Sequence, residues 1–254
     1  MHFAPRVLHT PAMNTPALHN PVFCALDTSE VGVATNLAAK LADTVGGVKL
    51  GLQFFNAHGP KGVMEVQKAS GLPLFLDLKF HDIPNTVAGA VRSVVPLKPY
   101  IINVHAAGGR AMMEAAAKAA TDASYEVVGS RPLVIAVTIL TSMDQADLGA
   151  TGVNGAVLDQ VRRLAALAQA SGLDGVVCSP QEASVLRSDL GSDFLLVTPG
   201  VRPLWSGADD QKRIMTPAEA MAAGASYLVV GRPITGAENP ADAAARIASE
   251  LGPQ

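Results

Sequence analysis

The sequence predicts an α/β fold, a (β/α)8 TIM barrel, and three observations predict it. Short apolar runs alternate with alanine-rich helical stretches from Pro21 onward. Eight such strand–helix pairs fill about 230 residues, a length typical of this barrel. Polar or charged residues follow most of the apolar runs, where the active rim of such a barrel lies. A doubly wound open sheet is the alternative, although no Gly-x-Gly-x-x-Gly follows the first strand.

The expected strands are apolar runs bounded by Gly, Pro or charged residues. In chain order they cover residues 22–26, 47–50, 73–79, 100–105, 133–138, 175–178, 194–197 and 227–230. The helices that follow them are expected at 30–43, 60–70, 84–95, 108–121, 155–169, 180–188, 217–223 and 240–251. Thr28 or Ser29 is suited to cap the first expected helix, and Thr216 is suited to cap the seventh. Pro84 is suited to the first turn of the third expected helix.

The amino-acid composition and the net charge argue against several classes of function. The chain has 254 residues, of which 49% are hydrophobic and 16% charged, so it has material for a large core. A net charge of −3 without a basic run argues against nucleic acid as a partner. No apolar run reaches membrane-spanning length, which predicts a soluble protein with no membrane partner. Cys24 and Cys178 lie inside apolar runs, which predicts buried thiols in a reducing, cytoplasmic setting, and no His/Cys cluster has metal-ligand spacing.

The domain organisation is expected to be simple. Residues 1–20 are rich in Pro, His and Asn and are expected to form a weakly ordered N-terminal extension, with Met13 as a candidate alternative start. Residues 21–254 are expected to form a single (β/α)8 catalytic domain. Residues 122–132 are expected to form a surface loop.

The stretch 74–86 contains an unusual concentration of charge. Alternation along a strand puts Asp77 and Lys79 on one face, opposite an apolar face built from leucines and Phe80, and Asp82 follows just beyond. A structural ion pair, with Asp82 as an ordinary helix cap, is one interpretation. The other is a catalytic lysine that its acidic neighbours keep protonated, ready to deliver a proton.

Other strand ends carry further candidates. Asp27, Lys49, Thr141, Ser142, Arg202, Gly231 and Arg232 all fall at or just after an expected strand. The loops after strands seven and eight often bind phosphate in these barrels, and an arginine suits that ligand. The long segment that contains Gln211 has the length of a lid. His58, His81 and His105 are interpreted as packed or hydrogen-bonded structural residues.

These residues fall within motifs that together resemble the bacterial orotidine 5′-phosphate decarboxylases. The resemblance covers about residues 21–246. Its motifs are Ala-Leu-Asp at 25–27, Val-Lys-Leu-Gly at 48–51, Asp-Leu-Lys-Phe-His-Asp-Ile-Pro-Asn-Thr at 77–86, Val-Thr-Ile-Leu-Thr-Ser-Met at 137–143, Thr-Pro-Gly-Val-Arg-Pro at 198–203, Asp-Gln-Lys-Arg-Ile-Met-Thr-Pro at 210–217 and Val-Gly-Arg-Pro-Ile at 230–234.

The resemblance implies a role for each motif. Lys79 is the implied proton donor, within an alternating charge array. The other members of that array are Asp27, Lys49, Asp77 and Asp82. Lys49 and Asp27 would hold the ribose hydroxyls, and Thr141 and Ser142 the pyrimidine edge. The implied ligands of the 5′-phosphate are Arg202, Gln211, Gly231 and Arg232. Asp82 and Thr86 would complete the site of a second subunit, so the implied working unit is a homodimer.

The implied reaction is the decarboxylation of orotidine 5′-phosphate (OMP) to UMP in pyrimidine biosynthesis, with no metal and no organic cofactor. Two alternatives remain open. One is a Mg²⁺-dependent sugar-phosphate decarboxylase or aldolase, because related barrels carry a similar Asp-x-Lys-x-x-Asp motif. The other is a non-catalytic nucleotide-binding protein.

Overall fold

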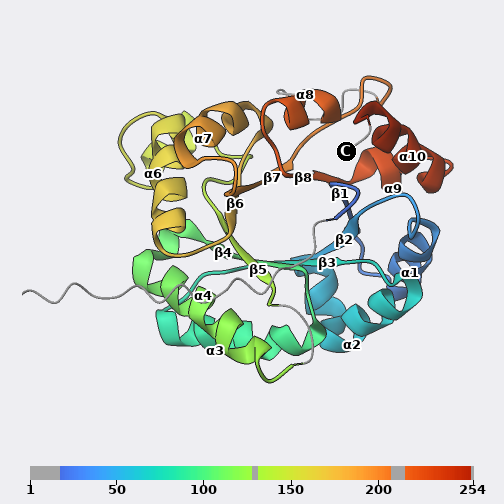
Figure 1. The fold of residues 1–254 in the computed structure, drawn as a ribbon, viewed down its shortest axis with the longest axis horizontal. Coiled ribbons are helices and arrows are strands. Elements are labelled where there is room, and N and C mark those ends of the chain that lie inside the picture. Colours follow the sequence, from blue (N-terminus) through green and yellow to red (C-terminus); the bar gives the residue numbers. More distant parts are fainter. Residues whose placement is uncertain (1–17, 128–130, 207–214, 253–254) are drawn as a thin grey trace, which may run out of the picture.

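The eight strands close into a barrel. The structure, a computed structural model, describes residues 18–127, 131–206 and 215–252. In these ranges the strands are parallel and neighbours in chain order, and β8 pairs with β1 through Val22↔Leu228 and Cys24↔Val230. Figure 1 shows the strands at the centre and the helices around them. The (β/α)8 prediction is confirmed, and the open-sheet alternative is wrong because an open sheet has two unpaired edges.

Each strand lies within two residues of its expected place. The strands are β1 (Val22–Ala25), β2 (Gly47–Gly51), β3 (Leu74–Phe80), β4 (Ile101–His105), β5 (Leu133–Val137), β6 (Gly175–Val177), β7 (Leu195–Pro199) and β8 (Tyr227–Val230). The agreement follows from burial: a strand of a closed parallel barrel is covered on both sides and therefore reads as a continuous apolar run.

The helices depart further from expectation. They are α1 (Val31–Lys40), α2 (Leu52–Ser70), α3 (Pro84–Val94), α4 (Arg110–Ser124), α5 (Gln145–Ala150), α6 (Val157–Ala170), α7 (Ala183–Leu190), α8 (Pro217–Ala222), α9 (Arg232–Thr235) and α10 (Pro240–Glu250). The short helices α5 and α9 were not expected. Helix α2 begins before the expected residue 60 because it kinks at Gly59, with a φ of 57°, instead of starting at Pro60. Helix α4 continues into the expected loop.

Two of the expected helix starts can be judged by their caps. Thr216 does cap α8: its side chain accepts a hydrogen bond from the Glu219 N–H at 3.2 Å. The expected cap of α1 by Thr28 or Ser29 is wrong. Glu30 is the N-cap residue there and makes no side-chain cap, while the Thr28 hydroxyl accepts a hydrogen bond from the Glu30 N–H.

Aromatic side chains fill the barrel interior near the N-terminal ends of the strands. Phe23 packs edge-on against Phe75 and Tyr227, with ring centroids 6.1 Å and 5.5 Å away. Gly47 is required beside this ring, because a Cβ there would lie 2.3 Å from Phe23. Outward-facing strand residues such as Leu76 instead join the larger core under the helices. The aromatic layer lies toward the N-terminal ends of the strands, so the interior is open toward their C-terminal ends.

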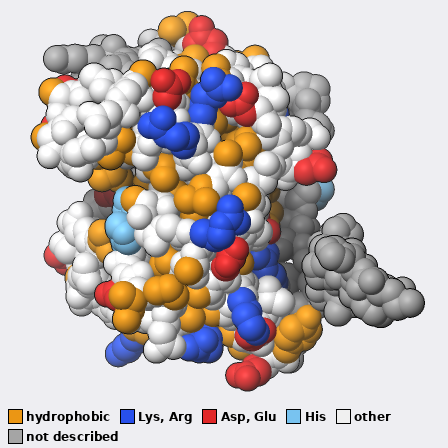
Figure 2. Space-filling model, turned by 90° about the vertical axis from the view of Figure 1, so that its left-hand side faces the viewer, with side chains coloured by type: hydrophobic (Ala, Val, Ile, Leu, Met, Phe, Trp, Pro, Cys, Tyr) orange, Lys and Arg blue, Asp and Glu red, His pale blue; other side chains and the backbone are white. Residues whose placement is uncertain are grey.

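The face shown in Figure 2 intersperses Lys and Arg side chains with Asp and Glu and with small apolar patches. Within the described ranges, no helix is both long and apolar enough to cross a bilayer.

Of the expected N-terminal extension, residues 1–17 lie outside the described part. Asn20 contacts the barrel, since its side chain donates to the Thr44 carbonyl and accepts from the Val22 N–H, each at 2.9 Å.

Candidate active site

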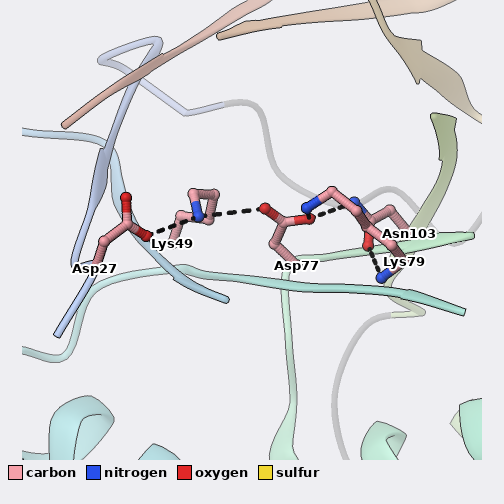
Figure 3. Close-up of polar contacts among 5 residues, drawn as sticks. All are labelled: Asp27, Lys49, Asp77, Lys79 and Asn103. Atoms are coloured by element: carbon pink, nitrogen blue, oxygen red, sulfur yellow. Dashed lines mark hydrogen bonds and ion pairs between the residues drawn. The ribbon is translucent and has the colours of Figure 1, made fainter. Parts of the chain in front are cut away.

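Four charged side chains form a connected row at the C-terminal ends of β1, β2 and β3. Lys49 Nζ lies 3.4 Å from Asp27 Oδ1 and 3.2 Å from Asp77 Oδ2. Lys79 Nζ lies 2.6 Å from Asp77 Oδ1. Figure 3 shows these contacts running from Asp27 through Lys49 and Asp77 to Lys79. The row alternates in sign, so each charge that leaves bulk water has an opposite charge beside it.

The row lies at an interruption of the β3–β4 ladder. Leu76 pairs with Ile102 and Phe80 with Val104, so three residues of β3 face the single residue Asn103 of β4. Lys79 has a φ of 50°, a left-handed conformation that costs a residue other than glycine roughly 1–2 kcal/mol. Alternation along a regular strand therefore explains the position of Asp77, whereas the bulge is needed to explain that of Lys79.

Asn103 bridges this interruption. Its Oδ1 accepts a hydrogen bond from the Lys79 backbone N–H at 2.7 Å, and its Nδ2 donates to Asp77 Oδ1 at 2.7 Å. The sequence analysis did not select Asn103. The signal available was an amide within the apolar run Ile-Ile-Asn-Val-His, on the strand next to the charged motif.

Asp77 is ionised despite its burial. Only 11% of its side chain is exposed, and burial by itself raises the pKa of a carboxyl. The charges of Lys49 and Lys79, with hydrogen bonds from Lys79 and Asn103, outweigh burial and hold the pKa of Asp77 below its usual value. A fixed negative charge thus stands between two ammonium groups inside a largely apolar barrel mouth.

These groups open into a cavity of about 360 Å³, a volume suited to a small organic ligand. The charged row and Asn103 form one part of its wall, and Thr141, Arg202, Gly231 and Arg232 also line it. Apolar side chains line the remainder: Ala25, Phe75, Val137, Ile139, Leu140, Val177, Val201 and Val229, with Pro199 and Pro233. An apolar wall that excludes water strengthens the electrostatic interactions within the cavity.

The two candidate phosphate arginines reach the same cavity from different strands. Arg202 follows β7 and is only 4% exposed, whereas Arg232 follows β8 and is exposed. Gly231 lies beside Arg232, and a Cβ at that position would approach Asp27 Oδ2 to 4.0 Å. Two guanidinium groups and the charged row therefore line the same cavity.

Other expected site residues lie outside this cavity lining. Ser142, Asp82 and Thr86 are exposed, and none of the three lines the cavity. The Asp82 carboxylate accepts a hydrogen bond from the Ile83 N–H at 2.6 Å. Interpreting Asp82 as the cap of α3 is wrong, because Ile83 is the N-cap residue there and makes no side-chain cap. Gln211 falls outside the described residues.

His105 and Cys24 lie near the charged row without belonging to it. The rings of His81 and His105 lie 5.5 Å apart, and burial, His81 and Lys79 together lower the pKa of His105. Both thiols are buried, which raises the pKa of Cys24 and of Cys178 to about 12. Among the described residues, no three His, Cys, Asp or Glu side chains gather in a metal-binding arrangement.

Comparison with known proteins places this geometry in a family. The family described as "Orotidine 5'-phosphate decarboxylase / HUMPS family" matches residues 20–247. The chain is 68% identical to the orotidine 5'-phosphate decarboxylase of Rhodospirillum rubrum over 91% of this chain and 94% of that protein. It is 55% identical to the enzyme of that name from Paramagnetospirillum magneticum, over 92% and 99% of the two chains.

Solved structures agree. The crystal structure of orotidine 5'-phosphate decarboxylase from Lactobacillus acidophilus matches with a TM-score of 0.80 at 36% identity, covering 92% of this chain and 99% of that one. A conserved protein from Geobacillus kaustophilus matches with a TM-score of 0.80 at 38% identity, over 91% and 100% of the two chains. The chain therefore belongs to the orotidine 5'-phosphate decarboxylase / HUMPS family.

Proposed function

We propose that this protein decarboxylates orotidine 5′-phosphate to UMP and CO2, and that it does so without a metal or an organic cofactor. The observation that carries the proposal is the Lys79–Asp77–Lys49 arrangement at the wall of a largely apolar cavity that Arg202 and Arg232 also line. The named activity of the relatives, at up to 68% identity over nearly the whole chain, supports the same substrate.

Lys79 is the proposed proton donor. When the bond between C6 of the pyrimidine and its carboxylate breaks, CO2 leaves and the electron pair stays on C6. An ammonium held beside C6 stabilises that developing charge more in the transition state than in the ground state, which is the condition for catalysis. The same ammonium then transfers a proton to C6 and forms UMP, and the resulting amine regains a proton from solvent.

Asp77 has two proposed roles. Its contact with Lys79 at 2.6 Å aims the ammonium of a side chain that is 28% exposed. Its negative charge also faces the position of the departing carboxylate, where repulsion raises the ground-state energy. Lys49 lies between Asp77 and Asp27, and together Lys49 and Asp27 are suited to bind ribose hydroxyls.

The remaining contacts are assigned by position in the cavity. Arg202, Gly231 and Arg232 are proposed to bind the 5′-phosphate, with Gln211 as a further ligand. Thr141 and Ser142 are proposed to meet the pyrimidine edge. Binding energy from the phosphate, remote from C6, is then available to orient the base and exclude water.

A homodimer is the proposed working unit, with Asp82 and Thr86 completing the site of the partner subunit. Their exposure beside β3, outside the cavity of their own chain, supports this assignment. We further propose a cytoplasmic location, where the two free thiols stay reduced.

The test is a spectrophotometric assay that follows the loss of OMP absorbance with and without EDTA, together with product identification. We expect equal rates in both conditions and UMP as the product. Turnover that EDTA abolishes, or turnover of a keto-sugar phosphate instead of OMP, would favour the Mg²⁺-dependent alternative. Tight UMP binding with no release of CO2 would identify a nucleotide-binding protein.

A further inference from the structure

We propose that Asn103 is a positioning residue that fixes the Asp77 carboxylate and the Lys79 backbone relative to each other. Its catalytic consequence rests on the proposed function, whereas its structural consequence does not. Asn103 is fully buried and lies on β4, the strand next to the one that carries both charged residues.

The first support is the interruption of the ladder. Between Leu76↔Ile102 and Phe80↔Val104, a regular parallel pairing would place one β3 residue opposite Asn103, but three are present. A bulge of this kind leaves backbone groups without their ladder partners. The Asn103 side chain supplies an acceptor for one of them, the Lys79 N–H, at 2.7 Å. Lys79 is also the residue that adopts the left-handed backbone.

The second support is the orientation of the amide, which the partners determine. A backbone N–H can only donate and an ionised carboxylate can only accept. Oδ1 of Asn103 must therefore face Lys79, and Nδ2 must face Asp77, as the two 2.7 Å contacts show. A reversed amide would place a donor against a donor and an acceptor against an acceptor. One side chain thus connects the backbone of Lys79 with the carboxylate that holds its ammonium.

The third support is the way the Asp77 carboxylate is held. Oδ1 accepts hydrogen bonds from Lys79 Nζ at 2.6 Å and from Asn103 Nδ2 at 2.7 Å, while Oδ2 forms an ion pair with Lys49 at 3.2 Å. Contacts from β2, β3 and β4 therefore fix the rotation of the carboxylate. Without the amide, the carboxylate can turn and carry the ammonium away from the reacting carbon. A displacement of about 1 Å can cost on the order of 100-fold in rate.

Asn103→Leu tests the pair of hydrogen bonds, because leucine has nearly the same shape but neither a donor nor an acceptor. We expect kcat to fall about 10- to 100-fold while KM changes less than about threefold, since the proposed phosphate and ribose ligands are untouched. Thr198→Val is the matched control. Thr198 is also fully buried on a barrel strand, and its hydroxyl lies 4.0 Å from the Cys178 thiol. We expect that variant to keep its kcat within about twofold.

Asn103→Asp separates the two hydrogen bonds. The new carboxylate still accepts from the Lys79 N–H, but it repels Asp77 until one of the pair takes up a proton. A protonated carboxyl then supplies the missing donor. The ratio of variant to wild-type kcat should therefore rise as the pH falls, with no such rise for Asn103→Leu. The other titratable groups around Asp77 are Lys49 on β2, Lys79 on β3 and His105 on β4, and all are common to both proteins.

A measurement without substrate distinguishes failure of this proposal from failure of the proposed function. Backbone hydrogen exchange at Lys79, resolved to single residues, should be at least about tenfold faster in Asn103→Leu than in the wild type. In Asn103→Asp and Thr198→Val it should be close to the wild type. If the wild type does not turn over OMP, the proposed function fails. The rate of hydrogen exchange at Lys79 then tests the positioning role of Asn103 by itself.

Three outcomes would overturn the proposal. They are wild-type kcat in Asn103→Leu, an equal loss of kcat in Thr198→Val, and unchanged Lys79 exchange in Asn103→Leu. If Asn103→Leu does not fold, the pH profile of Asn103→Asp tests the proposal instead. A ratio of variant to wild-type kcat that does not change with pH would contradict the hydrogen bond from Asn103 Nδ2 to Asp77.

Discussion

Lys79 and Asp77 lie two residues apart on β3, yet their charged atoms meet at 2.6 Å over the mouth of the barrel. In a regular strand both side chains leave the same face, which brings them near each other but leaves the long lysine chain free to choose its direction. The left-handed backbone at Lys79 and the amide of Asn103 remove that freedom. The ion pair is therefore a property of two neighbouring strands.

Replacing Lys79 with alanine should abolish decarboxylation. The variant loses the proposed proton donor and the charge proposed to lie beside C6, so we expect the rate of UMP formation to fall by at least about 10⁴-fold. Asp77 keeps Lys49 as a partner, so the fold and UMP binding should remain measurable by calorimetry. Lys118→Ala, which removes an exposed helical lysine, is the control, and near-normal turnover by Lys79→Ala would overturn the proposed role.

Arg232→Ala should weaken binding of the phosphorylated substrate. Loss of a charge-assisted hydrogen bond costs roughly 1.5–3 kcal/mol, so we expect KM for OMP to rise about 10- to 150-fold. The nucleoside orotidine, which has no phosphate, provides the internal control, because its slow turnover should be nearly the same in variant and wild type. A similar loss with both compounds would show that Arg232 does not act through the phosphate.

Mixing two inactive variants tests the shared site. If Asp82 serves the partner's cavity, a hybrid of Lys79→Ala and Asp82→Ala chains contains one site with both native residues. Half of the dimers in a statistical mixture are hybrids, so about a quarter of wild-type activity should return. Native mass spectrometry measures the hybrid fraction. Absence of recovery in a sample with confirmed hybrids would place Asp82 in the site of its own chain.

His105 should make the protein sensitive to acid. Its pKa is lowered in the folded protein, so the unfolded chain binds the proton more tightly. Stability is therefore full above the ordinary histidine pKa of about 6.5 and declines as the pH falls from there toward the lowered value in the folded state. His105→Gln removes the titration, so its melting temperature relative to wild type should rise by about 1–3 °C between pH 8 and pH 5.5.

Two companion variants check the cause of this shift. His81→Gln removes the neighbouring ring at 5.5 Å and should lessen the acid sensitivity without abolishing it, because burial is the larger cause. His19→Gln, which alters an exposed histidine that precedes β1, is the control variant. An acid sensitivity that is the same with and without His105 would contradict the interpretation.

The strands could be predicted closely because each is a buried apolar run. The helices were less predictable. Gly59 and Pro60 suggested a helix start, but packing continues α2 back to Leu52 across a kink. A local sequence signal that favours a break does not show whether the tertiary structure accommodates it as a bend.

The candidate site was predictable where polar residues interrupt or end apolar runs. Lys49, Asp77, Lys79 and Arg232 all line one cavity, as their positions toward or just after the ends of the expected strands indicated. Ser142 does not line that cavity, although it follows Thr141 directly, because consecutive side chains in a loop do not share a direction. Asn103 was missed because a single amide within an apolar run does not indicate a role until the groups that it contacts on the neighbouring strand are known.

By itself, the sequence determined the eight strand–helix pairs and the family motifs and favoured the barrel, because burial on both sides of a parallel strand and alternation within it are local properties of the chain. Only the tertiary structure decided how the charges are held. The bulge opposite Asn103, the left-handed backbone of Lys79 and the ionised state of buried Asp77 depend on groups from three strands. Electrostatic energy in a site of low polarity varies with distances of a few ångströms, and such distances are set when the strands pair.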